Sequence, residues 1–240
     1  MRTVEPGMYE YGVEALIESI FRERDAYMPA YPTIVGSGKN GTILHYDQNK
    51  SQIKDGDLIL IDAGCEYKHY CSDITRTIPA NGRFTDIQKE LYQIVLDAQL
   101  EAIGMIKPGI RFNEPHKEVI KIITSGLIEL GLLKGDVDKI VEDKEYRKFY
   151  MHSTSHLLGM EAHDAGKYKV DDESRKLEPG MVFTMEPGIY IAQDLEDVDE
   201  KYLGIGIRIE DNILVTENGY EVLTAKVPKT IEEIETVMNS

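Results

Sequence analysis

The sequence contains only two cysteines, Cys65 and Cys71, among its 240 residues. So low a count excludes the disulfide-dense scaffold of small secreted domains, and we expect both thiols to stay reduced. No apolar run approaches the ~20 residues that a membrane span requires, and the N-terminal stretch lacks the apolar segment of a signal peptide. The sequence therefore predicts a cytoplasmic protein with no membrane partner.

Positive charge is also scarce. The chain has 27 lysines and arginines against 43 aspartates and glutamates, which gives a formal net charge of −16, and no basic run offsets it locally. Such a surface repels a phosphate backbone, so nucleic-acid partners are excluded. With 42% hydrophobic residues the chain has the composition of a folded globular protein. We expect one domain over residues 1–240.

The order of predicted elements indicates an α+β fold with two β-rich blocks. The apolar spacing predicts a helix over 10–24, a capping box of Thr85 and Gln88 predicts the start of another, and a third is expected from an Asn113 cap to Gly131. Strand-like runs lie on both sides of these helices, before residue 79 and again from 181 to 223. This arrangement predicts a fold built from two duplicated halves.

Two aspartates stand in the strands of the first block. Asp62 follows the apolar run 58–61, and Asp73 opens the run 73–78. A hairpin centred between Tyr67 and Lys68 would place the two side chains opposite each other on one face. Carboxylates held that close repel, so they would share a proton or bind a cation.

The second block adds two more acids in apolar surroundings, Glu186 and Glu210, and a histidine cluster precedes it at His152, His156 and His163. Four carboxylates and a histidine make an oxygen-rich site of the kind that binds hard or borderline divalent metals. Charge balance favours two ions, because a single divalent cation leaves half of the −4 uncompensated. These donors favour manganese, with cobalt or zinc as alternatives.

Each of these residues also has a purely structural interpretation. A single acid in a strand is more often an edge or bulge residue, and a lone buried histidine more often completes a hydrogen bond in the core. Arg208, two positions before Glu210, could be simply its ion-pair partner. The coincidence of four acids with the histidine cluster favours the metal site.

Five stretches of the sequence closely resemble the pita-bread metallopeptidases, and among them the catalytic domain of the Xaa-Pro aminopeptidases. They are "YPTIVGSGKNGTILHY", "DGDLILIDAGCEYKHYCSDITRT", "HSTSHLLGMEAHDAG", "LEPGMVFTMEPGIYI" and "GIGIRIEDNILVTENGYEVLT". The resemblance implies a pita-bread fold with pseudo-two-fold halves. Full-length enzymes of this kind carry an additional N-terminal domain, which we expect to be absent from this chain. A homo-oligomer is compatible with the resemblance.

The resemblance also implies roles for individual residues. The two metal ions would be bound by Asp62, Asp73, His156, Glu186 and Glu210. In such enzymes a hydroxide that bridges the two metals attacks the scissile carbonyl, and Glu186 shuttles its proton. The implied catalytic and substrate-binding residues are His45, His152 and His163, with Tyr190 and Arg208 as further contacts to a peptide whose second residue is proline.

Two alternatives remain open at this stage. The nearest is prolidase, which cuts only Xaa-Pro dipeptides, followed by methionine aminopeptidase. The other is a binding module, because some proteins with this fold, such as a histone-chaperone subunit, have lost the metal ligands and only bind partners. Creatinase shares the fold without metal. The presence of all five implied ligands favours an enzyme.

Overall fold

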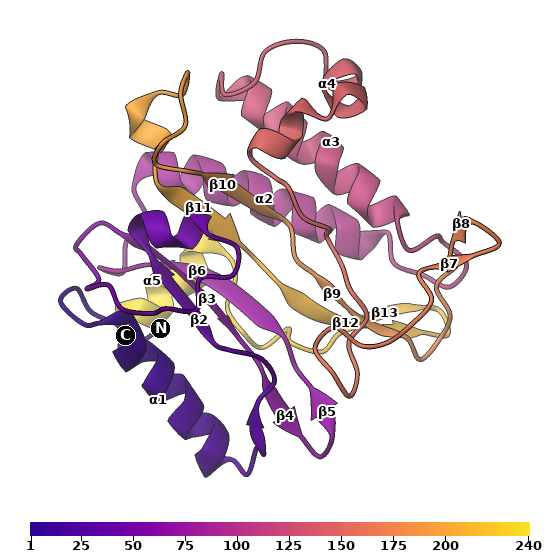
Figure 1. Ribbon diagram of the computed structural model, residues 1–240, viewed down its shortest axis with the longest axis horizontal. Coiled ribbons are helices and arrows are strands. Elements are labelled where there is room, and N and C mark those ends of the chain that lie inside the picture. Colours follow the sequence, from indigo (N-terminus) through magenta and orange to yellow (C-terminus); the bar gives the residue numbers. More distant parts are fainter.

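The computed structural model describes residues 1–240, and Figure 1 shows helices along the outer sides of short antiparallel strands. The first half contains one long helix before its strands and one after them. Its elements are α1 (Glu10–Glu23), β1 (Met28–Pro29), β2 (Ile34–Ser37), the 3-10 helix η1 (Gly38–Thr42), β3 (Leu58–Ala63), β4 (Cys65–Tyr67), β5 (Tyr70–Cys71), β6 (Ile74–Pro79) and α2 (Asp86–Gly104).

The second half begins with helices and ends with strands. Its elements are α3 (Glu114–Glu129), α4 (Val137–Asp143), η2 (Glu145–Lys148), β7 (Lys169–Val170), β8 (Glu173–Ser174), β9 (Val182–Met185), β10 (Gly188–Ile191), η3 (Glu200–Tyr202), β11 (Ile205–Arg208), β12 (Asp211–Thr216), β13 (Gly219–Val222) and α5 (Ile231–Met238). The first half contains two three-stranded antiparallel sheets, β1-β4-β5 and β2-β3-β6, and the second half contains one, β13-β12-β9. This is the α+β pita-bread fold that the sequence predicts.

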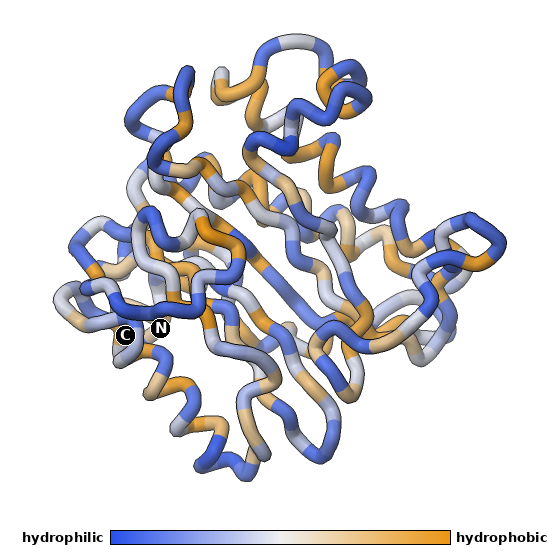
Figure 2. The backbone as a smooth tube through the Cα atoms, viewed as in Figure 1, coloured by the Kyte–Doolittle hydropathy of each residue, from blue (hydrophilic) through white to orange (hydrophobic).

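The apolar core joins the two halves. A cluster of 37 buried side chains extends from Val4 to Ile234 and includes most of the inner face of α2. In Figure 2 the hydrophobic stretches lie inside, while the tip around β7 and β8 is mostly hydrophilic. The predicted capping box is present, because the Thr85 hydroxyl accepts from Gln88 N and the Gln88 side chain accepts from Thr85 N. No helix is long and apolar enough to cross a membrane.

The hairpin that carries the two aspartates has a different register from the predicted one. Asp62 pairs with Thr75, and Glu66 pairs with Cys71, so the turn is centred between Lys68 and His69. Both turn residues have positive φ, 51° and 65°, as a two-residue hairpin turn requires. Neither residue is a glycine or an asparagine, so the usual sequence signal of such a turn is absent at this position. The predicted direct opposition of Asp62 and Asp73 is therefore wrong.

The two aspartates nevertheless share a face of the hairpin. Moving the turn centre by one residue changes the pairing by two positions, and side-chain direction repeats every two residues along a strand. Between β3 and β4 the two backbones approach closely at Gly64. A Cβ added to Gly64 would lie 1.8 Å from the Ser72 carbonyl oxygen, so only glycine fits there. Asp73 thus lies diagonally across from Asp62.

Candidate metal centre

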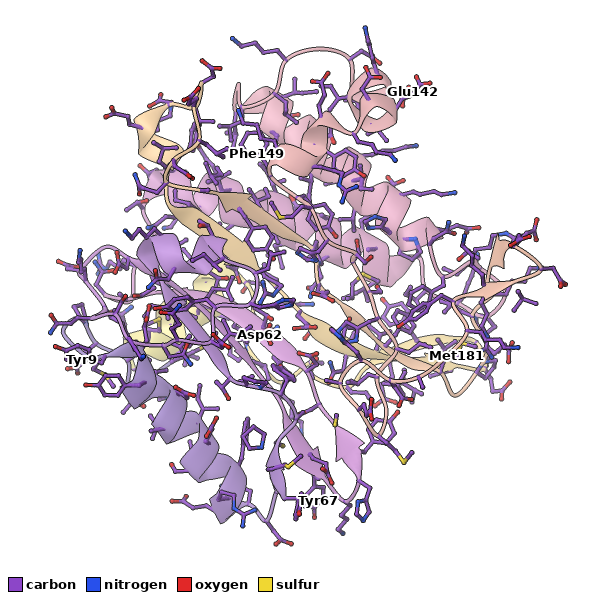
Figure 3. The ribbon with its side chains drawn as sticks, in the orientation of Figure 1. Tyr9, Asp62, Tyr67, Glu142, Phe149 and Met181 are labelled. Atoms are coloured by element: carbon purple, nitrogen blue, oxygen red, sulfur yellow. The ribbon has the colours of Figure 1, made fainter.

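The four acids converge where strands of the two halves end. Only Asp62 lies within a strand; Asp73 immediately precedes β6, Glu186 immediately follows β9, and Glu210 separates β11 from β12. The sequence placed the last three inside strands, but their position at strand ends frees the side chains to turn toward one another. Glu210 N donates to Thr75 O at 3.0 Å, which joins the second half to the first. Figure 3 labels Asp62 near the middle of the molecule.

The irregular segment 152–158 brings His156 to the same place. It runs beside β9, where Thr184 N donates to His156 O at 2.9 Å and Glu186 N donates to Thr154 O at 2.8 Å. These backbone bonds replace those of a regular strand and fix the imidazole over the acids. The run of serine and threonine between its two histidines gives the segment no helical or strand pattern of its own, so the sequence alone could not place it.

The donor atoms lie close enough to share a cation. One ligand atom each from Asp73, His156 and Glu210 lies within 4.8 Å of the other two. His156 Nε2 lies 3.4 Å from Asp73 Oδ2 and 3.5 Å from Glu186 Oε1. Together with Asp62, these are the five ligands that the sequence predicts. We call them the ligand cluster.

Hydroxyl groups hold the cluster in position. Tyr31 OH lies 2.7 Å from Asp62 Oδ1 and 2.5 Å from Asp73 Oδ1, and Thr75 Oγ1 donates to Glu210 Oε2 at 2.7 Å. Such contacts orient metal ligands and fix which oxygen faces the ion. The sequence analysis missed both residues. Nothing local distinguishes Tyr31 from the other tyrosines, since its role depends on two carboxylates that follow it by 31 and 42 positions.

Burial and mutual repulsion make the acids of the ligand cluster hard to ionise together. Burial raises the pKa of Asp62, of Glu210 and of Glu186, the last to about 7, and the neighbouring acids add to each shift. For His156, burial lowers the pKa, but the Asp73 hydrogen bond and the charges of Glu186 and Asp73 outweigh it and raise the pKa overall. A divalent cation would relieve this repulsion. Oxygen donors with one imidazole suit such an ion.

Arg208 faces Asp62, not Glu210. Its guanidinium donates to Asp62 Oδ2 at 2.6 Å, to Tyr190 OH at 2.9 Å and to Thr75 Oγ1 at 3.1 Å. The alternative interpretation of Arg208 as the ion-pair partner of Glu210 is therefore wrong. The side chain crosses from β11 to β3 in the other half, a proximity that local sequence spacing does not reveal. No lysine or arginine pairs with the other three acids of the cluster.

Both ring nitrogens of His152 are engaged within the protein. Nδ1 lies 2.8 Å from Ser153 O, and Nε2 lies 2.8 Å from Tyr190 OH. Burial, followed by the positive charge of Arg208, lowers the pKa of His152 to about 3, so the ring is neutral. Because Nδ1 must donate to a carbonyl, Nε2 accepts from the Tyr190 hydroxyl. His152 therefore presents a ring face and no free nitrogen.

The other two predicted histidines are more exposed. The ring of His163 stands edge-on to that of His156, with centroids 4.2 Å apart, and burial beside His156 lowers its pKa. His45 lies in the loop after η1 with no side-chain hydrogen bond of its own. Both line the cavity above the ligand cluster.

One cavity of about 1160 Å³ contains the ligand cluster and the predicted substrate side. His45, His152, His163 and Arg208 line it, whereas Tyr190 is 1% exposed and lies behind His152. The wall opposite includes residues that the sequence analysis did not select, Phe112, Asn113 and His116 from the start of α3. The volume exceeds the ~300–1,000 Å³ typical of small-molecule sites.

Comparison with known families matches residues 1–217 to the model of metallopeptidase family M24. The chain is 54% identical to the Xaa-Pro aminopeptidase of Escherichia coli and 52% identical to that of Haemophilus influenzae, over 99% and 100% of its length. It is 40% identical to Xaa-Pro aminopeptidase 3 of Homo sapiens over 99% of its length. The alignments cover 54%, 55% and 46% of these relatives, so the chain spans about half of their length.

Solved structures agree with this assignment. Aminopeptidase PepP of Pseudomonas aeruginosa superposes with a TM-score of 0.98 at 55% identity, and zinc-substituted Escherichia coli aminopeptidase P in complex with product superposes with a TM-score of 0.96 at 53% identity. Each match covers 99% of this chain and 54% of the other.

Proposed function

Since the chain belongs to metallopeptidase family M24, we propose that it is a metal-dependent aminopeptidase that removes the first residue from peptides with proline in second position. The observation that carries the proposal is the ligand cluster at the bottom of a large cavity, in a chain 54% identical to an Xaa-Pro aminopeptidase. Family membership and the oxygen-rich donor set both support a divalent metal cofactor.

We propose two metal ions, most favourably Mn²⁺, with Co²⁺ or Zn²⁺ as alternatives. The donors are Asp62, Asp73, His156, Glu186 and Glu210. Four carboxylates carry −4 and Arg208 compensates part of one, so a single divalent ion leaves excess negative charge at a buried site. The ions would polarise the scissile carbonyl and activate a water molecule.

The remaining side chains would handle protons and hold the peptide. Glu186 is suited to carry a proton because its carboxylate lies beside the proposed metal site, and in the metal-free fold burial raises its pKa to about 7. The exposed rings of His163 and His45 would donate to the reacting carbonyl and the leaving amine. His152, backed by Tyr190 and Arg208, would supply a neutral wall for the proline ring.

Proline suits such a site for a chemical reason. A bond to proline has no N–H, so a protease that grips that donor loses a contact, whereas polarising the carbonyl does not require it. Peptides would be the partners, with neither nucleic acid nor membrane. A cytoplasmic location fits the two free thiols, and a homo-oligomer is compatible with all of these features.

The test combines metal analysis with a substrate series. A preparation is analysed for bound metal and then assayed on Xaa-Pro-Ala, Xaa-Pro and Xaa-Ala-Ala, after chelation and after Mn²⁺ is restored. We expect metal-dependent release of the first residue from Xaa-Pro-Ala, at a rate roughly 10- to 200-fold above that for Xaa-Ala-Ala. Cleavage of the dipeptide alone would identify a prolidase, and peptide binding without any cleavage would identify a binding module.

A further inference from the structure

A single threonine hydroxyl links His116 to a buried tyrosine. Thr154 Oγ1 lies 2.6 Å from His116 Nδ1 and 2.5 Å from Tyr150 OH. Thr154 and Tyr150 are fully buried, whereas His116, in the first turn of α3, is partly exposed and lines the cavity. The three side chains form a short chain of hydrogen bonds from the core to the cavity wall.

Each of the two hydroxyls can donate only once, and this fixes the direction of the chain. Tyr150 OH has no partner except Thr154, and a buried donor left unused costs about 1–3 kcal/mol. Tyr150 therefore donates to Thr154, and the single hydroxyl hydrogen of Thr154 points to His116 Nδ1. Nδ1 is the acceptor, so Nε2 carries the ring hydrogen.

This Nε2–H is a free imidazole donor in the part of the cavity wall next to α3. It has no protein partner, whereas both nitrogens of His152 are engaged. Burial lowers the pKa of His116 and so favours the neutral ring, while the hydrogen bond with Thr154 selects its tautomer. A neutral donor fixed in one direction is suited to an acceptor oxygen of a bound molecule.

We propose that His116 is a further substrate-binding residue, whose Nε2–H donates to an acceptor oxygen of the bound peptide outside the scissile bond. The acceptor is a main-chain carbonyl or a terminal carboxylate, which share this chemistry. The proposal rests on the function proposed above and extends it to the α3 wall. The cavity, at about 1160 Å³, leaves room there for residues beyond the dipeptide unit.

The tautomer of His116 can be tested by NMR, without an assay of enzyme activity. In protein labelled with ¹⁵N-histidine, the His116 signals, assigned by their loss in His116→Ala, should show the Nε2–H tautomer alone. Thr154→Val removes the hydroxyl and should produce a mixture of tautomers. A wild-type ring protonated at Nδ1 would overturn the proposal. Titration of the metal-loaded protein with Pro-Ala, the expected product of Xaa-Pro-Ala, should shift the Nε2–H signal, and an unchanged signal at saturation would also contradict it.

The kinetic test uses His116→Ala with Lys117→Ala, an exposed residue of the same helix, as the matched control. The loss of one neutral hydrogen bond should raise KM for Xaa-Pro-Ala by roughly 2- to 10-fold in His116→Ala, with kcat little changed. Lys117→Ala should behave as wild type. An unchanged KM in His116→Ala would refute the proposed contact, and a fully active wild type would at the same time leave the proposed function standing.

A substrate whose C-terminus is capped as an amide identifies which oxygen accepts the hydrogen bond from His116. An increase in KM with Xaa-Pro-Ala but not with its C-terminal amide would identify the carboxylate, whereas an equal increase with both would identify a carbonyl. If the wild type cleaves neither peptide, the proposed function fails, and the Pro-Ala titration still decides whether His116 binds a peptide.

Discussion

The guanidinium of Arg208 lies 2.6 Å from the carboxylate of Asp62, a residue 146 positions earlier in the chain. The contact joins β11 of the second half to β3 of the first, and both side chains are largely buried. It gives Asp62 a cation that the other acids of the ligand cluster lack. Arg208 thus offsets part of the burial that raises the pKa of Asp62.

Breaking this pair should destabilise the protein strongly. Arg208→Leu leaves a buried carboxylate without a counter-ion, so we expect the free energy of unfolding to fall by about 3–5 kcal/mol in chelator, measured by urea denaturation. Arg111→Leu is the control, since its pair with Glu173 is exposed, and it should change stability by about 1 kcal/mol or less. Similar losses in the two variants would contradict the importance of burial.

Neutralising one ligand should remove metal without unfolding the chain. Asp73→Asn replaces a carboxylate that lies within ligand distance of His156 and Glu210, so we expect a folded protein with reduced bound metal and no measurable turnover. Asp47→Asn, an exposed acid at the cavity, should keep its metal. Full metal occupancy with normal turnover in Asp73→Asn would rule out Asp73 as a ligand.

His163 should act on the reaction and not on metal binding. In His163→Ala we expect kcat to fall by roughly 10²- to 10⁴-fold, the range for loss of a proton-transfer or hydrogen-bonding group. Metal content should be unchanged. His69→Asn, in the exposed hairpin turn, is the matched control and should retain wild-type kcat. Loss of metal from His163→Ala would move this residue into the coordination shell.

Metal removal should lower stability most at alkaline pH. Burial raises the pKa of Glu186 from 4.5 to about 7 in the metal-free fold, so the folded state holds a proton that the unfolded chain releases. Its contribution to stability is fully present below pH ~4.5 and is lost as the pH rises through ~7. Thermal melts with chelator or Mn²⁺ should therefore show a larger increase in Tm on metal binding at pH 8 than at pH 5.5.

Glu186→Gln separates the effect of Glu186 from that of other groups that titrate between pH 5.5 and pH 8. The variant cannot ionise at position 186, so the fall in Tm of the chelated protein between pH 5.5 and pH 8 should be smaller than in the wild type. An identical pH dependence in the two proteins would show that Glu186 does not titrate in this range.

Helix 10–23 and the capping box at Thr85 were predictable from the sequence because both depend on neighbours within a few positions. The third helix shows the limit of such signals. Asn113 does stand at its start, but its side chain makes no capping bond and Oδ1 is buried without a partner. The predicted hairpin register failed for a related reason, since Lys68 and His69 adopt positive φ without the residue types that usually announce it.

The sequence by itself predicts which side chains would bind metal. Four carboxylates and a histidine in apolar surroundings are chemically costly unless a cation compensates them, and that argument needs no coordinates. The tertiary structure alone decided their partners. Arg208 of the second half pairs with Asp62 of the first, Tyr31 bridges Asp62 and Asp73 within the first half, and Thr154 orients His116 within the second. Contacts across such separations depend on packing of the whole chain, which no local pattern encodes.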